Sequence, residues 1–84
     1  ADAILVYPNP SNGNFTLQLI ESLAGPILLS VYDYSGKLLS QKNLNGNQLS
    51  HQLSIQNSVS TSGIYFLHLQ SENGVVIKKI SVLK

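Results

Sequence analysis

The sequence divides into short apolar runs that alternate with turn-forming residues. Residues 14–19 alternate polar and apolar side chains, and the same period of two returns in residues 27–31 and 49–55. Asn-Gly pairs, prolines and the segment 33–36 separate the runs at spacings of about 8 to 12 residues. No stretch has the roughly 3.6-residue period of an amphipathic helix. These features predict an all-β fold, a seven-stranded antiparallel immunoglobulin-like β-sandwich.

The alternation also predicts which side chains form the core, because alternate positions of a strand lie on one face. The expected inward-facing set is Phe15, Leu17, Val31, Leu53, Ile55, Tyr65, Leu67 and Leu69. Leu49 and His51 are expected on the inward side of residues 49–55. Residues 64–69 are largely apolar on both faces, which is typical of a central strand that is covered on both sides.

Residues 7–15, YPNPSNGNF, concentrate constraints on the backbone. Pro8 and Pro10 restrict φ and lack an N–H donor, and Pro10 also keeps Asn9 out of the helical region. Gly13 can supply the positive φ that a tight reversal requires. The stretch is therefore expected to be a stiff corner that turns the first strand into the second.

The later turns also have definable mechanisms. The Asp33 carboxylate can accept hydrogen bonds from the backbone N–H groups just ahead of it, while Gly36 takes the positive φ at the end of a type I turn. Gly63 permits a sharp entry into the strand that contains Tyr65. The Asn-Gly pair at residues 73–74 should join that strand to the last one as an antiparallel hairpin.

Length and composition limit the class of protein. The 84 residues predict a single domain, residues 1–84, in which residues 1–6 are the first strand or a linker. With no cysteine, 11% charged residues and a net charge of +1, we expect no disulfide, thiolate metal site or basic nucleic-acid surface. No apolar run approaches the roughly 20 residues of a membrane helix. Residues 3–6 are too short for a signal peptide, so export would require a segment upstream.

The residues that could carry chemistry are few and separated. The carboxylates lie at strand ends or in turns, so no paired acid and base is expected among Asp2, Glu21, Asp33 and Glu72. His51 and His68 have too few acidic neighbours to complete a metal site, and we interpret them as partly buried or rim histidines. The serines of residues 54–62 match no nucleophile-elbow pattern, and no glycines have phosphate-loop spacing. We expect no catalytic, cofactor or metal site, and a protein that is not an enzyme.

Four short motifs follow one another along the chain. They are Tyr7-Pro8-Asn9-Pro10 with Gly13, Val31-Tyr32-Asp33 with Gly36-Lys37, Gly63-Ile64-Tyr65, and Lys78-Lys79-Ile80. Together, over about residues 7–84, they resemble the C-terminal sorting domain of cargo proteins of the type IX secretion system. Each motif alone could occur in any β-protein, whereas four in order at matching spacing are specific. One departure is Val59, because members of this family often carry a leucine there.

The resemblance implies that the domain is an address signal. It implies a larger passenger protein that precedes the domain, enters the periplasm by an upstream signal peptide, and leaves through the type IX translocon of a Gram-negative bacterium. In many members a surface sortase-like peptidase then removes the domain and joins the passenger to an anchor. The implied localisation is secreted or at the cell surface, with no membrane insertion and no nucleic-acid partner.

The resemblance also divides the matched residues by role. The positions expected to be architectural are Tyr7, Pro8, Asn9, Pro10, Gly13, Asp33, Gly36, Gly63 and Tyr65. The candidates for direct recognition are the lysines Lys37, Lys78, Lys79 and Lys84. The last three are close in the sequence, which predicts a local concentration of positive charge that a translocon component could contact.

Two other functions remain open from the sequence. An immunoglobulin-like or fibronectin-like module of an adhesin could bind glycan or protein through Tyr32, Tyr34 and the nearby loops. A structural spacer would need no partner surface. We expect a monomer, although an exposed last strand with Ile77, Ile80 and Val82 could pair with a second copy by strand addition.

Overall fold

The computed structural model describes residues 4–22 and 25–84, and these form seven strands in the predicted order. They are β1 (Ile4–Tyr7), β2 (Asn14–Leu19), β3 (Pro26–Asp33), β4 (Leu38–Asn45), β5 (Ser50–Ser54), β6 (Gly63–Ser71) and β7 (Gly74–Val82). Residues 1–3, which include Asp2, lie outside the described residues, so only residues 4–6 of the predicted first strand or linker can be placed, in β1. The described residues contain no helix of the length and apolarity needed to cross a membrane.

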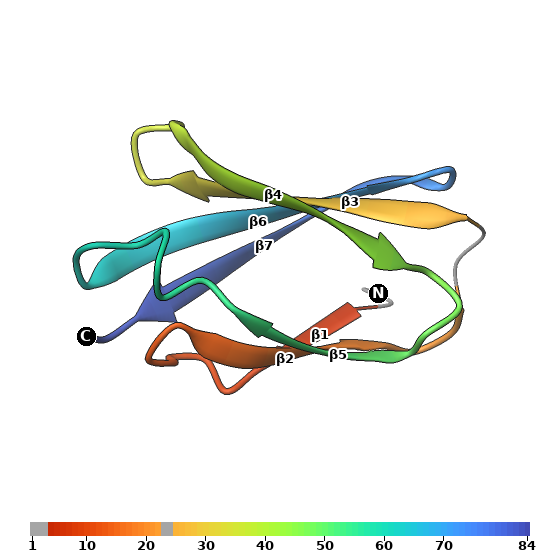
Figure 1. The fold of residues 1–84 in the computed structure, drawn as a ribbon, viewed down its shortest axis with the longest axis horizontal. Coiled ribbons are helices and arrows are strands. Elements are labelled where there is room, and N and C mark those ends of the chain that lie inside the picture. Colours follow the sequence, from red (N-terminus) through yellow and green to blue (C-terminus); the bar gives the residue numbers. More distant parts are fainter. Residues whose placement is uncertain (1–3, 23–24) are drawn as a thin grey trace.

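The strands form two sheets that pack face to face (Figure 1). Sheet A has the order β1-β2-β5, and sheet B has the order β4-β3-β6-β7. Every strand pair within the two sheets is antiparallel. The chain passes from one sheet to the other between β2 and β3, between β4 and β5, and between β5 and β6. Each sheet turns its apolar face toward the other sheet. The predicted all-β antiparallel sandwich is confirmed.

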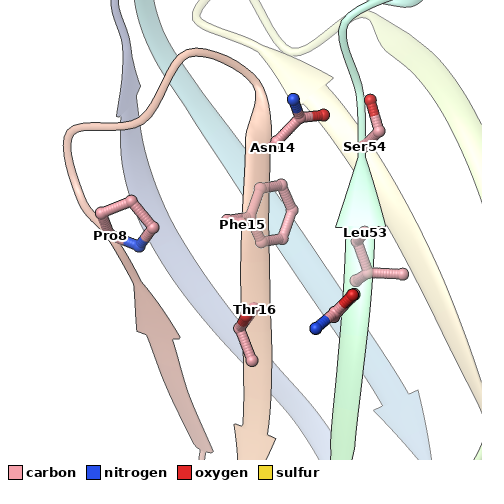
Figure 2. Close-up of a pocket in the computed structure, with 7 residues that line it drawn as sticks. Pro8, Asn14, Phe15, Thr16, Leu53 and Ser54 are labelled. Carbon is pink, nitrogen blue, oxygen red and sulfur yellow. The ribbon is translucent and has the colours of Figure 1, made fainter.

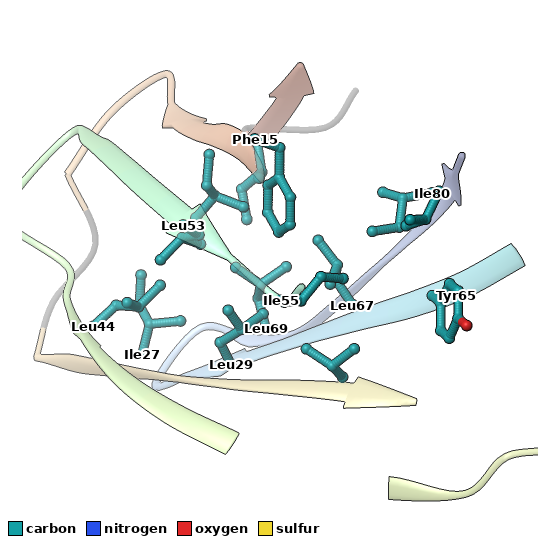
Figure 3. Close-up of a cluster of buried hydrophobic side chains, with 14 of the residues drawn as sticks. Phe15, Ile27, Leu29, Leu44, Leu53, Ile55, Tyr65, Leu67, Leu69 and Ile80 are labelled. Atoms are coloured by element: carbon teal, nitrogen blue, oxygen red, sulfur yellow. The ribbon is translucent and has the colours of Figure 1, made fainter. Parts of the chain in front are cut away.

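The core fills the space between the sheets. All eight predicted core side chains are buried there, and in Figure 3 side chains from both sheets point toward one another. The other buried members of the cluster are Ile4, Leu19, Ile27, Leu29, Leu44, Val59, Ile80 and Val82. Each fully buried aliphatic or aromatic side chain contributes about 1.5–3 kcal/mol to stability relative to an exposed one. Val59, the departure from the family pattern, is part of this core.

The prediction that the strand of residues 64–69 is covered on both sides is wrong. β6 does lie inside sheet B, between β3 and β7, but only its inner face is buried. On the outer face Phe66 and His68 are half-buried, with ring contacts to Tyr34 (centroids 6.4 Å apart) and Tyr32 (4.4 Å). Aromatic side chains from β3 and from the turn after it partly cover Phe66 and His68, so the rings on this face are half-buried without a third layer.

Two further expectations about burial need correction. Leu49 is 42% exposed, because it precedes β5 and lies outside the alternation that buries His51 and Leu53. In β7, Ile80 and Val82 belong to the core and are not an exposed edge surface, whereas Ile77 is 56% exposed. The alternation of β7 places Ile77 on the outer face and the other two on the inner face.

The predicted turns are confirmed. The hairpin between β6 and β7 closes with Ser71 paired to Gly74, and Gly74 has a φ of 120°. In the turn after β3, the N–H of Gly36 donates to the carbonyl oxygen of Asp33 at 3.0 Å, and Gly36 has a φ of 90°. This turn fixes where β4 begins, and just before it the pairing of β3 with β4 shifts register between Val31 and Tyr32.

Candidate recognition surface

Segments that are far apart in the sequence meet at one end of the sandwich. We call it the C-terminal end, and it consists of residues 8–13, 33–37, 56–62 and 83–84 (Figure 1). Each strand runs opposite to the one before it. For this reason the connections after β1, β3 and β5, and the end of β7, all lie at the same end. Every family-matched turn and glycine is therefore at this end or on a strand that starts from it.

Asn9 joins the corner of residues 8–13 to the last strand. Its Oδ1 accepts a hydrogen bond from the Ser81 N–H at 2.8 Å, and its Nδ2 donates to the Lys79 carbonyl oxygen at 3.3 Å. A side-chain amide offers a donor and an acceptor like those of a peptide group, so Asn9 takes the place of a strand residue beside β7. The sequence indicated an architectural role for Asn9 but no partner about 70 residues away.

Ser11 continues this contact with its backbone. Its N–H donates to the Ser81 carbonyl oxygen at 3.0 Å, and its carbonyl oxygen accepts from the Leu83 N–H at 2.8 Å, which forms a parallel bridge to Val82. Ser11 is buried, and its Oγ accepts from the Gly13 N–H at 3.2 Å. The sequence analysis did not identify Ser11. We call Asn9 and Ser11 together the β7 clamp, because they cover the edge of β7 from Lys79 to Leu83.

Gly13 is required by both conformation and space. Its φ is 106°, and a Cβ on it would lie 2.7 Å from Gln56 Cγ and 3.4 Å from the Gln56 backbone. The Gly13 carbonyl oxygen accepts from the Ile55 N–H at 2.8 Å, and Gln56 Nε2 donates to the Asn12 carbonyl oxygen at 3.2 Å. Any side chain at Gly13 would strain the backbone and push the corner away from residues 56–62.

Lys84 ties the loop of residues 56–62 to the end of β7. Its Nζ donates to the carbonyl oxygens of Gln56 at 3.0 Å and Val59 at 2.6 Å, and its backbone N–H donates to Ser62 Oγ at 2.7 Å. A lysine ammonium has three donors and satisfies loop carbonyls that have no strand partner. The sequence marked Lys84 as a recognition residue and gave no sign of this contact.

Tyr65 anchors the same loop from the core side. The ring is buried, and its hydroxyl donates to the Thr61 carbonyl oxygen at 2.6 Å. Buried tyrosines usually find a partner for the hydroxyl in this way. Gly63 has a φ of 158°, close to extended, and no atom lies within 4 Å of where its Cβ would be. Tyr65 therefore makes contacts that support its predicted architectural role, whereas the space around Gly63 does not by itself require a glycine.

Asp33 organises the turn of residues 33–37. Its Oδ1 accepts from the Ser35 hydroxyl at 2.6 Å and from the backbone N–H groups of Ser35 and Lys37, both at 2.9 Å. These hydrogen bonds, led by that of the Ser35 hydroxyl, lower the pKa of the Asp33 carboxyl below its usual value of 3.8. The carboxylate is therefore used locally to shape the turn.

The structure separates the four candidate lysines. Lys78 and Lys79 are neighbours in β7 and so lie on opposite faces, Lys79 exposed on the outer face and Lys78 half-buried on the inner one. Lys37 is exposed at the C-terminal end, in the turn of residues 33–37. The expected concentration of positive charge does not form, because alternation splits one pair and carbonyl contacts hold the Lys84 ammonium.

A shallow recess of about 390 Å³ lies beside the corner, between β2 and β5 (Figure 2). Its lining residues are Pro8, Asn14, Phe15, Thr16, Gln52, Leu53 and Ser54. None of these side chains titrates, so the recess has no group for acid or base catalysis. His51 is buried nearby in β5, and its Nε2 lies 2.8 Å from the Gln48 carbonyl oxygen, which gives it a structural role.

Comparison with known proteins agrees with this architecture. The sequence profile of the family described as "Secretion system C-terminal sorting domain" matches residues 5–83. No curated relative matches the sequence. A similar solved structure is that of PorZ, described as an essential bacterial surface component of the type-IX secretion system of human oral-microbiomic Porphyromonas gingivalis. The TM-score is 0.71 at 18% identity, and the match covers 99% of this chain and 12% of that chain.

The identity with PorZ is low, so that likeness supports the fold alone, while the family profile covers nearly all of the chain. A profile match of this extent, on a sandwich whose matched turns meet at one end, settles the family. The chain belongs to the secretion-system C-terminal sorting domains, non-catalytic domains that direct cargo proteins through the type IX secretion system to the bacterial cell surface.

Proposed function

We propose that the C-terminal end is the surface that the type IX translocon recognises, on a passenger protein that precedes the domain. The observation that supports this is the convergence of the family-matched turns on one end. Long-range hydrogen bonds from Asn9 and Lys84 hold that end in one shape. A surface assembled from four separate segments exists only in the folded domain, so recognition would be independent of the passenger's own chemistry.

The lysines then have different roles in the proposal. Lys37 and Lys79 are exposed and are the candidates for charge-assisted contact with the translocon. Lys84 acts through the loop of residues 56–62, whose carbonyl groups its ammonium binds. Lys78 is half-buried on the inner face of β7 and is a weaker candidate for contact than Lys79.

The test is export of a reporter in a bacterium that has a type IX system. Residues 1–84 are fused behind a periplasmic reporter protein, and the reporter is measured in periplasm, on the cell surface and in the medium. We expect it to leave the periplasm when the fused domain is folded. If the reporter stays periplasmic although the domain resists proteolysis, the chain lacks a sufficient signal and the proposal is wrong.

Charge reversal separates contact from folding. Lys37→Glu at the C-terminal end should reduce export, whereas Lys42→Glu on β4, also exposed and outside that end, should not. Both variants should unfold within about 1 kcal/mol of the parent, because exposed charges contribute little to stability. Equal export of the two variants would remove Lys37 from the proposed contact surface.

The same fusion protein also tests whether the domain is removed after export. We propose that a surface sortase-like peptidase removes the domain and attaches the passenger to an anchor, as the family resemblance implies. The mass of the exported reporter decides this. A reporter that has lost residues 4–84 and gained an anchor supports removal, and an exported reporter of full length shows that this domain is retained.

Glycan binding is the competing function, and one observation favours it. Tyr34 is 78% exposed and stacks on Phe66 with ring centroids 6.4 Å apart, which is an arrangement that can hold a sugar ring. A glycan array with the isolated domain and its Tyr34→Ala variant tests this. Binding that depends on Tyr34, together with failure of the export test, would place the domain among adhesin modules.

A further inference from the structure

The two halves of the outer edge of β7 differ in what covers them. Lys79 and Ser81 direct backbone groups away from β6, since these groups bond to the β7 clamp of Asn9 and Ser11. In an antiparallel ladder the residues of one strand direct their N–H and C=O pairs to the two sides in alternation. Val75 and Ile77 lie at alternate positions of β7 in line with Lys79, so their backbone groups have the same orientation. Their N–H and C=O groups therefore face outward as well.

The clamp does not reach this second half. Within residues 4–22 and 25–84, the clamp's hydrogen bonds end at Lys79 and none is made to the outward backbone groups of Val75 or Ile77. Their side chains are each 56% exposed. A short open edge that carries two exposed β-branched residues is a template for another strand. We call residues 74–77 the open edge.

The opposite edge of sheet B is protected in a different way. There β4 places Lys42 opposite the buried Leu29, so Lys42 lies on the face directed toward sheet A. An inward-pointing charge at an edge strand opposes strand addition, because pairing would desolvate it. Among residues 4–22 and 25–84, sheet B thus has one edge protected by a lysine, and one edge that the clamp covers over only half of its length.

Charges flank the open edge in a self-complementary order. Glu72 lies at the hairpin tip before it and Lys79 lies after it, both exposed. In an antiparallel pair of two identical edges, the start of one strand lies beside the end of the other. Glu72 of each copy would then approach Lys79 of the other copy, while Val75 and Ile77 form a shared apolar cluster. Opposite charges across a strand pair stabilise it, and like charges oppose it.

We propose that the open edge pairs two copies of this chain by antiparallel strand addition, with Val75 of one copy opposite Ile77 of the other. This proposal does not depend on the sorting function. The register centres on Val76, which faces its own counterpart, and joins the two copies of sheet B into one continuous sheet. The contact is short and buries far less than the roughly 1,200 Å² of a stable interface. Association is therefore weak, with a dissociation constant on the order of 0.1–1 mM.

Sedimentation of the purified chain tests the pairing. The average mass should rise with concentration over roughly 0.05 to 1 mM, the range set by the expected affinity. Ile77→Lys should remain monomeric, because it places a charge in the shared cluster. The matched control is Ile20→Lys, since Ile20 is also exposed but lies outside the strands, and it should associate like the parent. Asn9→Ala removes the part of the clamp that covers Lys79 and should strengthen association several-fold by uncovering more of the edge.

The register is tested by cross-linking, which is clean because the chain has no cysteine. Residues that face each other at a non-hydrogen-bonded pair have Cα atoms about 4.5 Å apart, within reach of a disulfide. Val76→Cys should therefore form a disulfide dimer in a glutathione redox buffer far faster than Leu5→Cys, an exposed position on β1. A chain that stays monomeric at 1 mM, or equal cross-linking of the two variants, overturns the proposal.

Discussion

The two ends of the sandwich are held together by different kinds of interaction. At the C-terminal end, local turn bonds such as those of Asp33 are joined by side-chain hydrogen bonds between residues 22 to 72 apart in sequence, such as Asn9 with Ser81 and Lys84 with Gln56. At the opposite end, in residues 45–51 and 71–73, the described side-chain hydrogen bonds connect residues two or three apart. Side chains connect distant segments at the C-terminal end, whereas at the opposite end the described long-range hydrogen bonds are made by the backbone, from the Gly46 N–H to the Gly25 carbonyl oxygen and from the Leu19 N–H to the Leu49 carbonyl oxygen.

This difference tells which substitutions are informative. A change in a local turn alters one connection, and the rest of the sandwich can keep its packing. A change at the C-terminal end disturbs segments contributed by three or four parts of the chain. The family-matched residues are concentrated at the end where such coupling exists. Matched substitutions at the two ends can therefore separate long-range coupling from ordinary turn stability.

The largest effect is expected at Tyr65, where the core meets the C-terminal end. Tyr65→Ala should lower the free energy of unfolding by about 3–5 kcal/mol, which is a large share of the stability of so small a domain. Tyr65→Phe keeps the ring and removes only the hydrogen bond to Thr61, so it should cost about 1 kcal/mol. Urea denaturation followed by circular dichroism measures both. A Tyr65→Ala variant that unfolds like the parent would contradict the core assignment.

A glycine pair compares the ends directly. Gly13→Val should destabilise by about 1–3 kcal/mol from backbone strain alone, and further because the new side chain displaces Gln56. Gly74→Val at the opposite end has strain at a φ of 120° but no atom within 4 Å of its Cβ, so its cost should be smaller. The measurement is the urea midpoint of each variant. Equal costs would show that the contact with Gln56 carries no weight.

Loss of the clamp side chain should have a smaller effect on stability. Asn9→Ala removes two exposed hydrogen bonds to β7 and should cost about 1–2 kcal/mol in total. Asn45→Ala removes one local bond to the Asn47 N–H and should cost less. Amide hydrogen exchange by NMR provides the sharper measurement, because only Asn9→Ala should speed exchange at Ser81. Unchanged exchange there would rule out the clamp contact in solution.

The smallest effect concerns pH and the turn of residues 33–37. The pKa of Asp33 is lower in the folded chain than in the unfolded one, so its stabilising contribution is complete above the ordinary value of 3.8. That contribution is lost as pH falls from there through the lowered pKa. NMR titration of the Asp33 carboxyl should show this, and Ser35→Ala should move the pKa back toward 3.8, since the Ser35 hydroxyl is its main cause. An unchanged pKa in Ser35→Ala would refute that assignment.

Much of the fold and part of the candidate surface could be predicted from sequence. The period of two placed Phe15 and Leu67 in the core, and the Asp33 turn followed from one carboxylate and one glycine. Even the meeting of the motifs at one end follows from strand number and antiparallel direction. The β7 clamp could not be predicted, because nothing near Asn9 indicates that its partners are residues 79 and 81. Ser11 gave no signal, since a buried backbone bridge leaves no mark on residue type.

By itself the sequence determined where the strands and turns are and which faces of the inner strands are apolar. These features depend on interactions within a few residues, namely side-chain alternation, proline and glycine conformation, and local carboxylate hydrogen bonds. Only the tertiary structure decided that Lys84 binds the loop of residues 56–62, and that Asn9 and Ser11 cover the β7 edge from Lys79 to Leu83. Those outcomes depend on which edges meet when the two sheets close on each other, and that requires contacts between groups some 25 to 72 residues apart.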